Sequence, residues 1–62
     1  MNTFLYRGRN INFRYYPHIH KIRFFLAGAY VGTIITLQGK NQMLIDPELS
    51  DAFCDEFPEY FI

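Results

Sequence analysis

Apolar and polar side chains alternate near the beginning of the chain with the period of a β-strand. Residues 3–6 are β-prone, and residues 11–15 place three apolar side chains on one face. The segment between them, 7–10, contains glycine and asparagine and supplies a turn. The pattern predicts an antiparallel hairpin that ends before Pro17, since proline cannot donate a hydrogen bond to a neighbouring strand.

A second hairpin is predicted over residues 31–45, where a run rich in β-branched side chains is followed by a turn at 38–41. Residues 19–23 alternate imperfectly, so their strand assignment stays open. Gly28 and Gly32 lie within the same apolar region. Glycine inside such a run indicates a bulge, a bend or a close approach of two backbones.

The last part of the chain has the spacing of an amphipathic helix. Asp46 is a suitable N-cap, Pro47 fits the first helical position and Glu48 suits the first turn. Four apolar residues then follow the helical repeat: Leu49, Ala52, Phe53 and Phe57. Pro58 stops the helix. A helix of roughly ten residues is marginal alone, so it is expected to pack on the sheet or on a partner.

Length and composition bound the fold. Sixty-two residues, half of them hydrophobic, make one small domain that buries about 60% of the surface exposed by its unfolded chain. Such a chain is too apolar for a disordered tail and too short for a nucleotide-binding α/β enzyme. We predict a mostly β protein, with a small antiparallel or barrel-like sheet of four or five strands and one short C-terminal helix. Residues 1–46 are predicted to form a basic, aromatic, β-rich module, and residues 47–62 an acidic helix and aromatic tail of the same single domain.

The formal net charge of zero hides a division along the chain. All six basic residues lie in 1–40, and all six acidic residues lie in 41–62. Such an asymmetry between the two parts of a chain indicates partners. Three interpretations follow: the acidic end folds back on the basic part, the basic part binds a polyanion, or the two ends face different protein partners.

The sequence offers little for catalysis or for metal binding. Cys54 is the single cysteine, so no disulfide forms within the chain, and its acidic neighbours argue against a reactive thiolate. His18 and His20 have no third metal ligand nearby in the sequence. We therefore expect a protein that is not an enzyme and that holds no metal or cofactor. The lone cysteine and the lack of a signal pattern favour the cytoplasm.

The leading functional hypothesis is a small, non-catalytic protein–protein interaction or regulatory subunit that binds another protein or its own copy as an oligomer. Its acidic, aromatic C-terminal segment supplies ring anchors and steering charges. The residues predicted for this partner-binding segment are Phe53, Asp55, Glu56, Phe57, Glu59, Tyr60 and Phe61. A basic aromatic face from the first half of the chain pairs with that segment or meets an acidic partner. Its predicted members are Tyr6, Arg7, Arg9, Phe13, Arg14, Tyr15 and Arg23.

Two alternatives come from other classes of protein. Cations beside rings are typical of small sheets that bind single-stranded nucleic acid, which makes the basic N-terminal hairpin a candidate interface. The uncharged run 24–39, flanked by Arg23 and Lys40, is the candidate for a single-span membrane subunit. A span needs about twenty predominantly apolar residues, and this run is shorter and contains polar side chains, so a membrane location is not expected.

Overall fold

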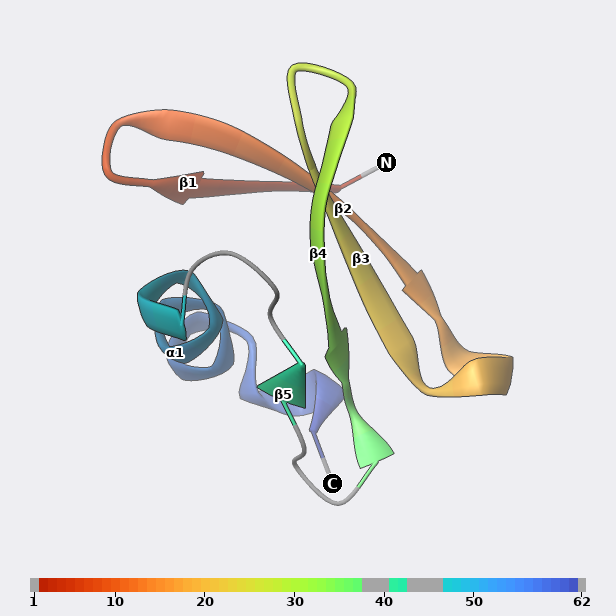
Figure 1. The fold of residues 1–62 in the computed structure, drawn as a ribbon. Helices are drawn as coiled ribbons and strands as arrows, with labels where there is room; N and C mark the ends of the chain where they lie inside the picture. Colours follow the sequence, from red (N-terminus) through yellow and green to blue (C-terminus); the bar gives the residue numbers. More distant parts are fainter. Residues whose placement is uncertain (1, 38–40, 43–46, 62) are drawn as a thin grey trace.

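The computed structural model describes residues 2–37, 41–42 and 47–61. Its five strands form one antiparallel sheet in which each strand pairs with the next along the chain (Figure 1). The strands are β1 (Asn2–Tyr6), β2 (Arg9–Tyr16), β3 (Lys21–Leu26), β4 (Ala29–Ile35) and β5 (Asn41–Gln42). The other elements are the helix α1 (Pro47–Glu56) and the short 3₁₀ turns η1 (Pro17–Ile19) and η3 (Pro58–Tyr60). This arrangement confirms the predicted mostly β fold with a short C-terminal helix.

The helix packs on one face of the sheet, and the ring of Phe53 is the centre of that contact. Phe53 is completely buried. Its ring lies edge-on to the rings of Phe24, Phe13 and Phe4, with centroid distances of 4.8, 4.9 and 5.4 Å. Alternate residues of the strands point toward the helix, as the strand period of two requires. The buried apolar residues are Phe4, Ile11, Phe13, Ile22, Phe24, Ile34, Leu49 and Phe53.

The segment after α1 continues this core. The backbone N–H of Phe57 donates a hydrogen bond to the carbonyl oxygen of Phe53 at 2.9 Å. The ring of Tyr60, in η3, lies 4.7 Å from the ring of Tyr15 on β2. Phe57, Tyr60 and Phe61 are all partly buried against the core. The aromatic tail is therefore packed on the chain's own sheet.

The start of α1 is joined to the first hairpin by an ion pair. Pro47 begins the helix, as predicted, and the predicted N-cap Asp46 lies outside the described residues. The carboxylate of Glu48, in the first helical turn, pairs with the guanidinium of Arg7 in the turn between β1 and β2. Both side chains are about two-thirds exposed, at 66% and 68%, so the pair contributes little to stability.

The first predicted hairpin is confirmed as β1 and β2, and the second is confirmed in its described part by the antiparallel pairing of β4 with β5. A further hairpin, which was not predicted, joins β3 and β4 around Ala27–Gly28. The pattern concealed β3 because residues 24–26 are apolar in succession, and so show no alternation. β4 also pairs with the two-residue β5, as the predicted returning strand requires. Residues 43–45 of that predicted strand lie outside the described residues.

The helix that the single-span alternative requires over the run 24–39 does not form where the structure describes this run. Residues 24–26 end β3 and residues 29–35 form β4, so this stretch is a hairpin and not a helix. Among the described residues, no helix has the length and apolar character needed to cross a membrane.

The two-residue turns of both hairpins have the same unusual backbone. Arg7 and Gly8 have φ angles of 51° and 78°, and Ala27 and Gly28 have φ angles of 50° and 83°. Two successive positive φ values are typical of type I′ turns, which match the twist of the strands that they join. Glycine adopts these angles freely, whereas a Cβ atom makes them unfavourable at Arg7 and Ala27.

Replacing Ala27 with asparagine is expected to stabilise the protein by up to about 1 kcal/mol, because asparagine tolerates the left-handed region better than alanine. Ala29→Asn is the matched control, since Ala29 is also exposed but has no positive φ at the start of β4. Urea unfolding followed by circular dichroism measures both variants. A gain at Ala29, or none at Ala27, contradicts this account of the turn.

Candidate functional site: an open basic and aromatic sheet face

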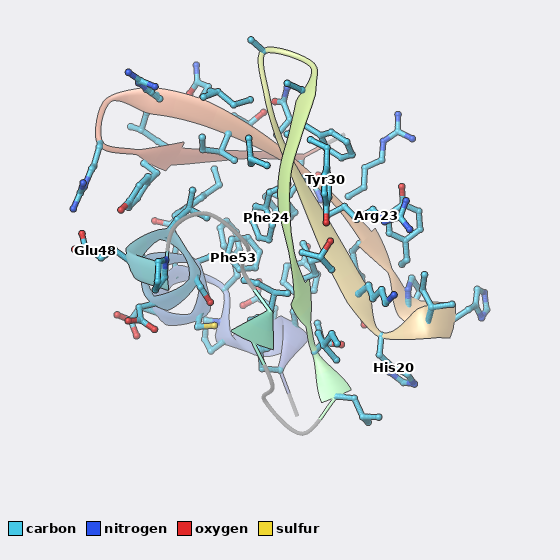
Figure 2. The ribbon with its side chains drawn as sticks, viewed as in Figure 1. His20, Arg23, Phe24, Tyr30, Glu48 and Phe53 are labelled. Atoms are coloured by element: carbon cyan, nitrogen blue, oxygen red, sulfur yellow. The ribbon has the colours of Figure 1, made fainter. Side chains whose placement is uncertain are left out.

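The face of the sheet turned away from α1 carries cations and aromatic rings. In the part of the chain that the structure describes, the helix and η3 both pack on the other face (Figure 1). Figure 2 shows Phe24 and Phe53 on the side of the helix and Arg23 and Tyr30 on the other side. We call this second side the open face. Its residues are Thr3, Leu5, Asn10, Asn12, Arg14, Tyr16, Lys21, Arg23, Phe25, Tyr30, Thr33 and Ile35.

Two arginines form the centre of the open face. Arg14 on β2 and Arg23 on β3 lie directly opposite each other, and both side chains are exposed. The guanidinium carbon of Arg23 lies 5.3 Å from the ring centroid of Tyr16. Like charges at directly opposed positions destabilise a sheet. A pair that lowers the stability of the free protein is expected where an anion binds, because functional sites commonly trade stability for activity.

Two rings lie side by side on the strands next to this pair. Phe25 on β3 is opposite Tyr30 on β4, with ring centroids 6.0 Å apart and an angle of 63° between the rings. The hydroxyl of Tyr30 forms a hydrogen bond with the hydroxyl of Thr33 at 2.5 Å. Tyr30 is nevertheless 49% exposed. The hydrogen bond therefore holds a ring in place while leaving much of its surface open to a ligand.

Tyr30 reaches the open face because β4 contains a bulge. Gly32 lies opposite Phe24, whereas Tyr30 lies opposite the next residue of β3. Val31 is thus an extra residue between the two pairs. In a regular strand, positions 30 and 32 are two residues apart and lie on the same side of the sheet, which here is the helix side. Bulges commonly re-aim a side chain in this way beside functional sites.

Cations and rings are arranged in rows across the strands. Tyr16 and Lys21 are opposite each other in one row, the two arginines form the next row, and Phe25 with Tyr30 forms the third. Successive rows are about 7 Å apart, since they are two residues apart along each strand. The arginine pair is therefore bordered by aromatic rings on both sides.

The carboxylates lie elsewhere on the molecule. None of the described strands contains an acidic residue. The described acidic residues are Glu48, Asp51, Asp55, Glu56 and Glu59, in α1 and η3. Figure 2 shows Glu48 at the helix, on the far side of the sheet from Arg23. The described carboxylates thus lie on the helix side of the sheet, whereas Arg14, Lys21 and Arg23 lie on the open face.

The structure divides the predicted basic aromatic face between the two sides of the sheet. Arg14 and Arg23 are brought together on the open face. The rings predicted beside them face the helix instead: Phe13 is in the core, Tyr6 packs against the core and Tyr15 contacts the ring of Tyr60. The other predicted cations are exposed at the first hairpin: Arg7, in its ion pair, and Arg9.

The predicted partner-binding segment is also divided. Its rings are turned toward the sheet and belong to the core or pack against it: Phe53, Phe57, Tyr60 and Phe61. Its carboxylates are exposed: Asp55, Glu56 and Glu59. Binding of a partner through this segment stays a prediction, and the exposed carboxylates are the part of it left open to solvent.

Sequence reasoning missed three aromatic residues of the open face. Tyr16 could have been predicted, because strict alternation along β2 puts it on the same side of the sheet as Arg14. Phe25 required the recognition of β3, and Tyr30 required the position of the bulge. No local pattern marks that bulge beyond Gly32, which was noted as a possible irregularity of the strand.

Cys54 lies on α1 and is half-buried. Burial raises the pKa of its thiol, and the carboxylates of Asp51 and Asp55 raise it further, while the hydroxyl of Ser50 offsets part of the effect. A thiol with a raised pKa is mostly protonated at neutral pH and is a poor nucleophile. Within the described residues, no three of the histidine, cysteine and acidic side chains gather closely enough to hold a metal ion.

Arg14→Glu is expected to stabilise the free protein, because it replaces a like-charged pair with an opposite-charged pair across β2 and β3. The expected gain is about 0.2–1 kcal/mol, and it should shrink in high salt. Thermal unfolding at low and high salt measures it. The double variant Arg14→Glu/Arg23→Glu is the control, since it restores like charges and should lose the gain. A double variant as stable as the single one contradicts repulsion between the two arginines.

Asp55→Asn is expected to lower the pKa of Cys54, because the removed carboxylate disfavours the thiolate. Alkylation by iodoacetamide at pH 8 should then accelerate, because a larger fraction of the thiol is ionised. Glu59→Gln is the control, since Glu59 is not among the groups that shift this pKa. The pH dependence of the alkylation rate measures the effect, and an unchanged midpoint in Asp55→Asn contradicts it.

A scan against protein-family models gave no match for this chain. Searches of curated proteins and of solved structures gave no match either. What the open face binds is therefore inferred from its own side chains.

Proposed function

We propose that this protein is a non-catalytic binding module that takes an anionic macromolecule on its open face. The observation that carries the proposal is the direct opposition of Arg14 and Arg23 on exposed strand positions. The two charges repel each other in the free protein. A bound anion removes that repulsion and accepts charge-assisted hydrogen bonds from both guanidinium groups.

The separation of charge supports the same proposal. The described carboxylates are on α1 and η3, on the side of the sheet opposite the two arginines. An anionic partner thus approaches the open face without meeting a described acidic residue on the strands. Electrostatic complementarity of this kind steers encounter and suppresses wrong partners.

The side chains that serve as nucleophiles in many enzymes support a non-catalytic role. Ser50 is the only serine of the chain, and its side chain is buried on the helix. The thiol of Cys54 has a raised pKa, which disfavours the reactive thiolate. Binding, rather than bond making, is the chemistry that the open face supports.

A role in protein–protein contact remains compatible with this proposal at a second surface. The exposed carboxylates of Asp55, Glu56 and Glu59 suit a basic partner, as the leading hypothesis from the sequence requires. The rings of that segment are needed by its own core, so substitution of these carboxylates, and not truncation before Phe53, is the way to examine it.

Titration with inorganic polyphosphate, a polyanion without rings, tests the proposed function. The protein is expected to bind polyphosphate at low salt, and binding should weaken steeply as salt rises, because counterions are released. Arg14→Gln and Arg23→Gln should each weaken binding and reduce the slope of log affinity against log salt by about one. Isothermal titration calorimetry at several salt concentrations measures both quantities.

Arg9→Gln is the matched control for that titration. Arg9 is an exposed arginine on β2, the strand that carries Arg14, but its position belongs to the helix side of the sheet. It should change polyphosphate affinity less than either substitution in the pair. The proposal fails if the wild-type protein does not bind polyphosphate at low salt. It also fails if Arg14→Gln and Arg23→Gln bind as well as wild type.

A further inference from the structure

We infer that the anionic partner of the open face is single-stranded nucleic acid, with phosphates at Arg14 and Arg23 and bases stacked on the neighbouring rings. This inference rests on the proposed function, since it assigns a partner to the same face. It goes further because it gives the rings a role of their own. From the N-terminal hairpin it uses Arg14 and Tyr16 on β2, and it adds Arg23, Phe25 and Tyr30 on β3 and β4.

The rings are the first argument. A partner that offered only negative charge would require only the arginines, yet the pair is bordered by Tyr16 on one side and by Phe25 and Tyr30 on the other. Small sheets bind single strands with this combination, in which cations follow the phosphates and exposed rings stack on bases. The rows lie about 7 Å apart, so one partner contacts both kinds of side chain at once.

The orientation of Tyr30 is the second argument. The bulge at Val31 turns this ring from the helix side to the open face, beside Phe25. The hydrogen bond to Thr33 then restrains the ring in a half-exposed position. A ring that is exposed and held in place presents its surface to a base without losing further side-chain freedom on binding.

Polar groups beside the rings are the third argument. Asn12 lies opposite Phe25 on β2, and the hydroxyls of Tyr30 and Thr33 lie on the β4 side. Amide and hydroxyl groups hydrogen-bond to the edges of unpaired bases. In a duplex these bases are stacked on one another and are closed to the rings, so a single strand is the form that uses all three kinds of side chain.

Fluorescence anisotropy with a labelled oligothymidylate of twelve nucleotides tests the inference on the full chain. Tyr30→Leu and Phe25→Leu remove one ring each and keep an apolar side chain. Each should weaken oligothymidylate binding by about 5- to 150-fold, the range given by the loss of one base–ring stack. Neither should change polyphosphate binding, because polyphosphate has no bases. Tyr30→Phe keeps the ring and should keep most of the affinity.

Tyr15→Leu is the matched control, since Tyr15 is a tyrosine of the same sheet on the helix side, in contact with Tyr60. It should leave oligothymidylate binding unchanged. Circular dichroism of each variant shows that it is folded before its affinity is compared. Competition with the corresponding duplex and with polyglutamate completes the experiment, and both should compete less well than unlabelled oligothymidylate.

The outcomes separate this inference from the proposed function. Two results would show that the nucleic-acid partner is wrong while the anion-binding face stands. In the first, polyphosphate binds at the arginines and oligothymidylate binds no more tightly than polyphosphate. In the second, the ring variants weaken the binding of polyphosphate and of oligothymidylate equally. Polyglutamate binding more tightly than oligothymidylate identifies an acidic protein segment and also overturns the inference. Binding of neither polyphosphate nor oligothymidylate overturns both proposals.

Discussion

The packing of one ring, that of Phe53, organises the whole molecule. It is completely buried and lies edge-on to rings from β1, β2 and β3, so a single side chain of α1 joins three strands. Edge-to-face contacts of this kind add to the hydrophobic gain from burying the rings. α1 lies on one face of the sheet and leaves the other face uncovered by any described helix. The existence of an open face is thus a direct consequence of where the core is placed.

With one face closed by the helix, the chain uses its aromatic residues for two purposes. The rings on the helix side of the sheet, such as those of Phe13 and Phe24, stabilise the fold together with the rings of the C-terminal segment. The rings on the open face, which include Tyr30 because of the bulge in β4, lie on the surface beside Arg14 and Arg23. A large fraction of aromatic residues in so small a protein therefore reflects a core on one side of the sheet and a candidate binding surface on the other.

The predictable parts of the structure are those governed by local chemistry. The glycine turn of the first hairpin, the proline that ends β2 and the apolar spacing of α1 all behave as expected, since each depends on neighbouring residues. β3 was concealed because it has rings on both sides, which removes the alternation on which strand prediction depends. The candidate site was harder to predict. The opposition of Arg14 and Arg23 depends on a register set by η1, and the position of Tyr30 depends on an extra residue in β4.

The order of the strands has a consequence for the folding pathway. Since each strand pairs with its neighbour in sequence, the hairpins of β1 to β4 form from local contacts, which favours rapid pairing. The ring that closes their apolar side is Phe53, which packs on them only when α1 docks. A sheet that has formed before α1 docks exposes rings on both sides. Such a partly folded sheet is the species in which apolar surface and aggregation are coupled most closely.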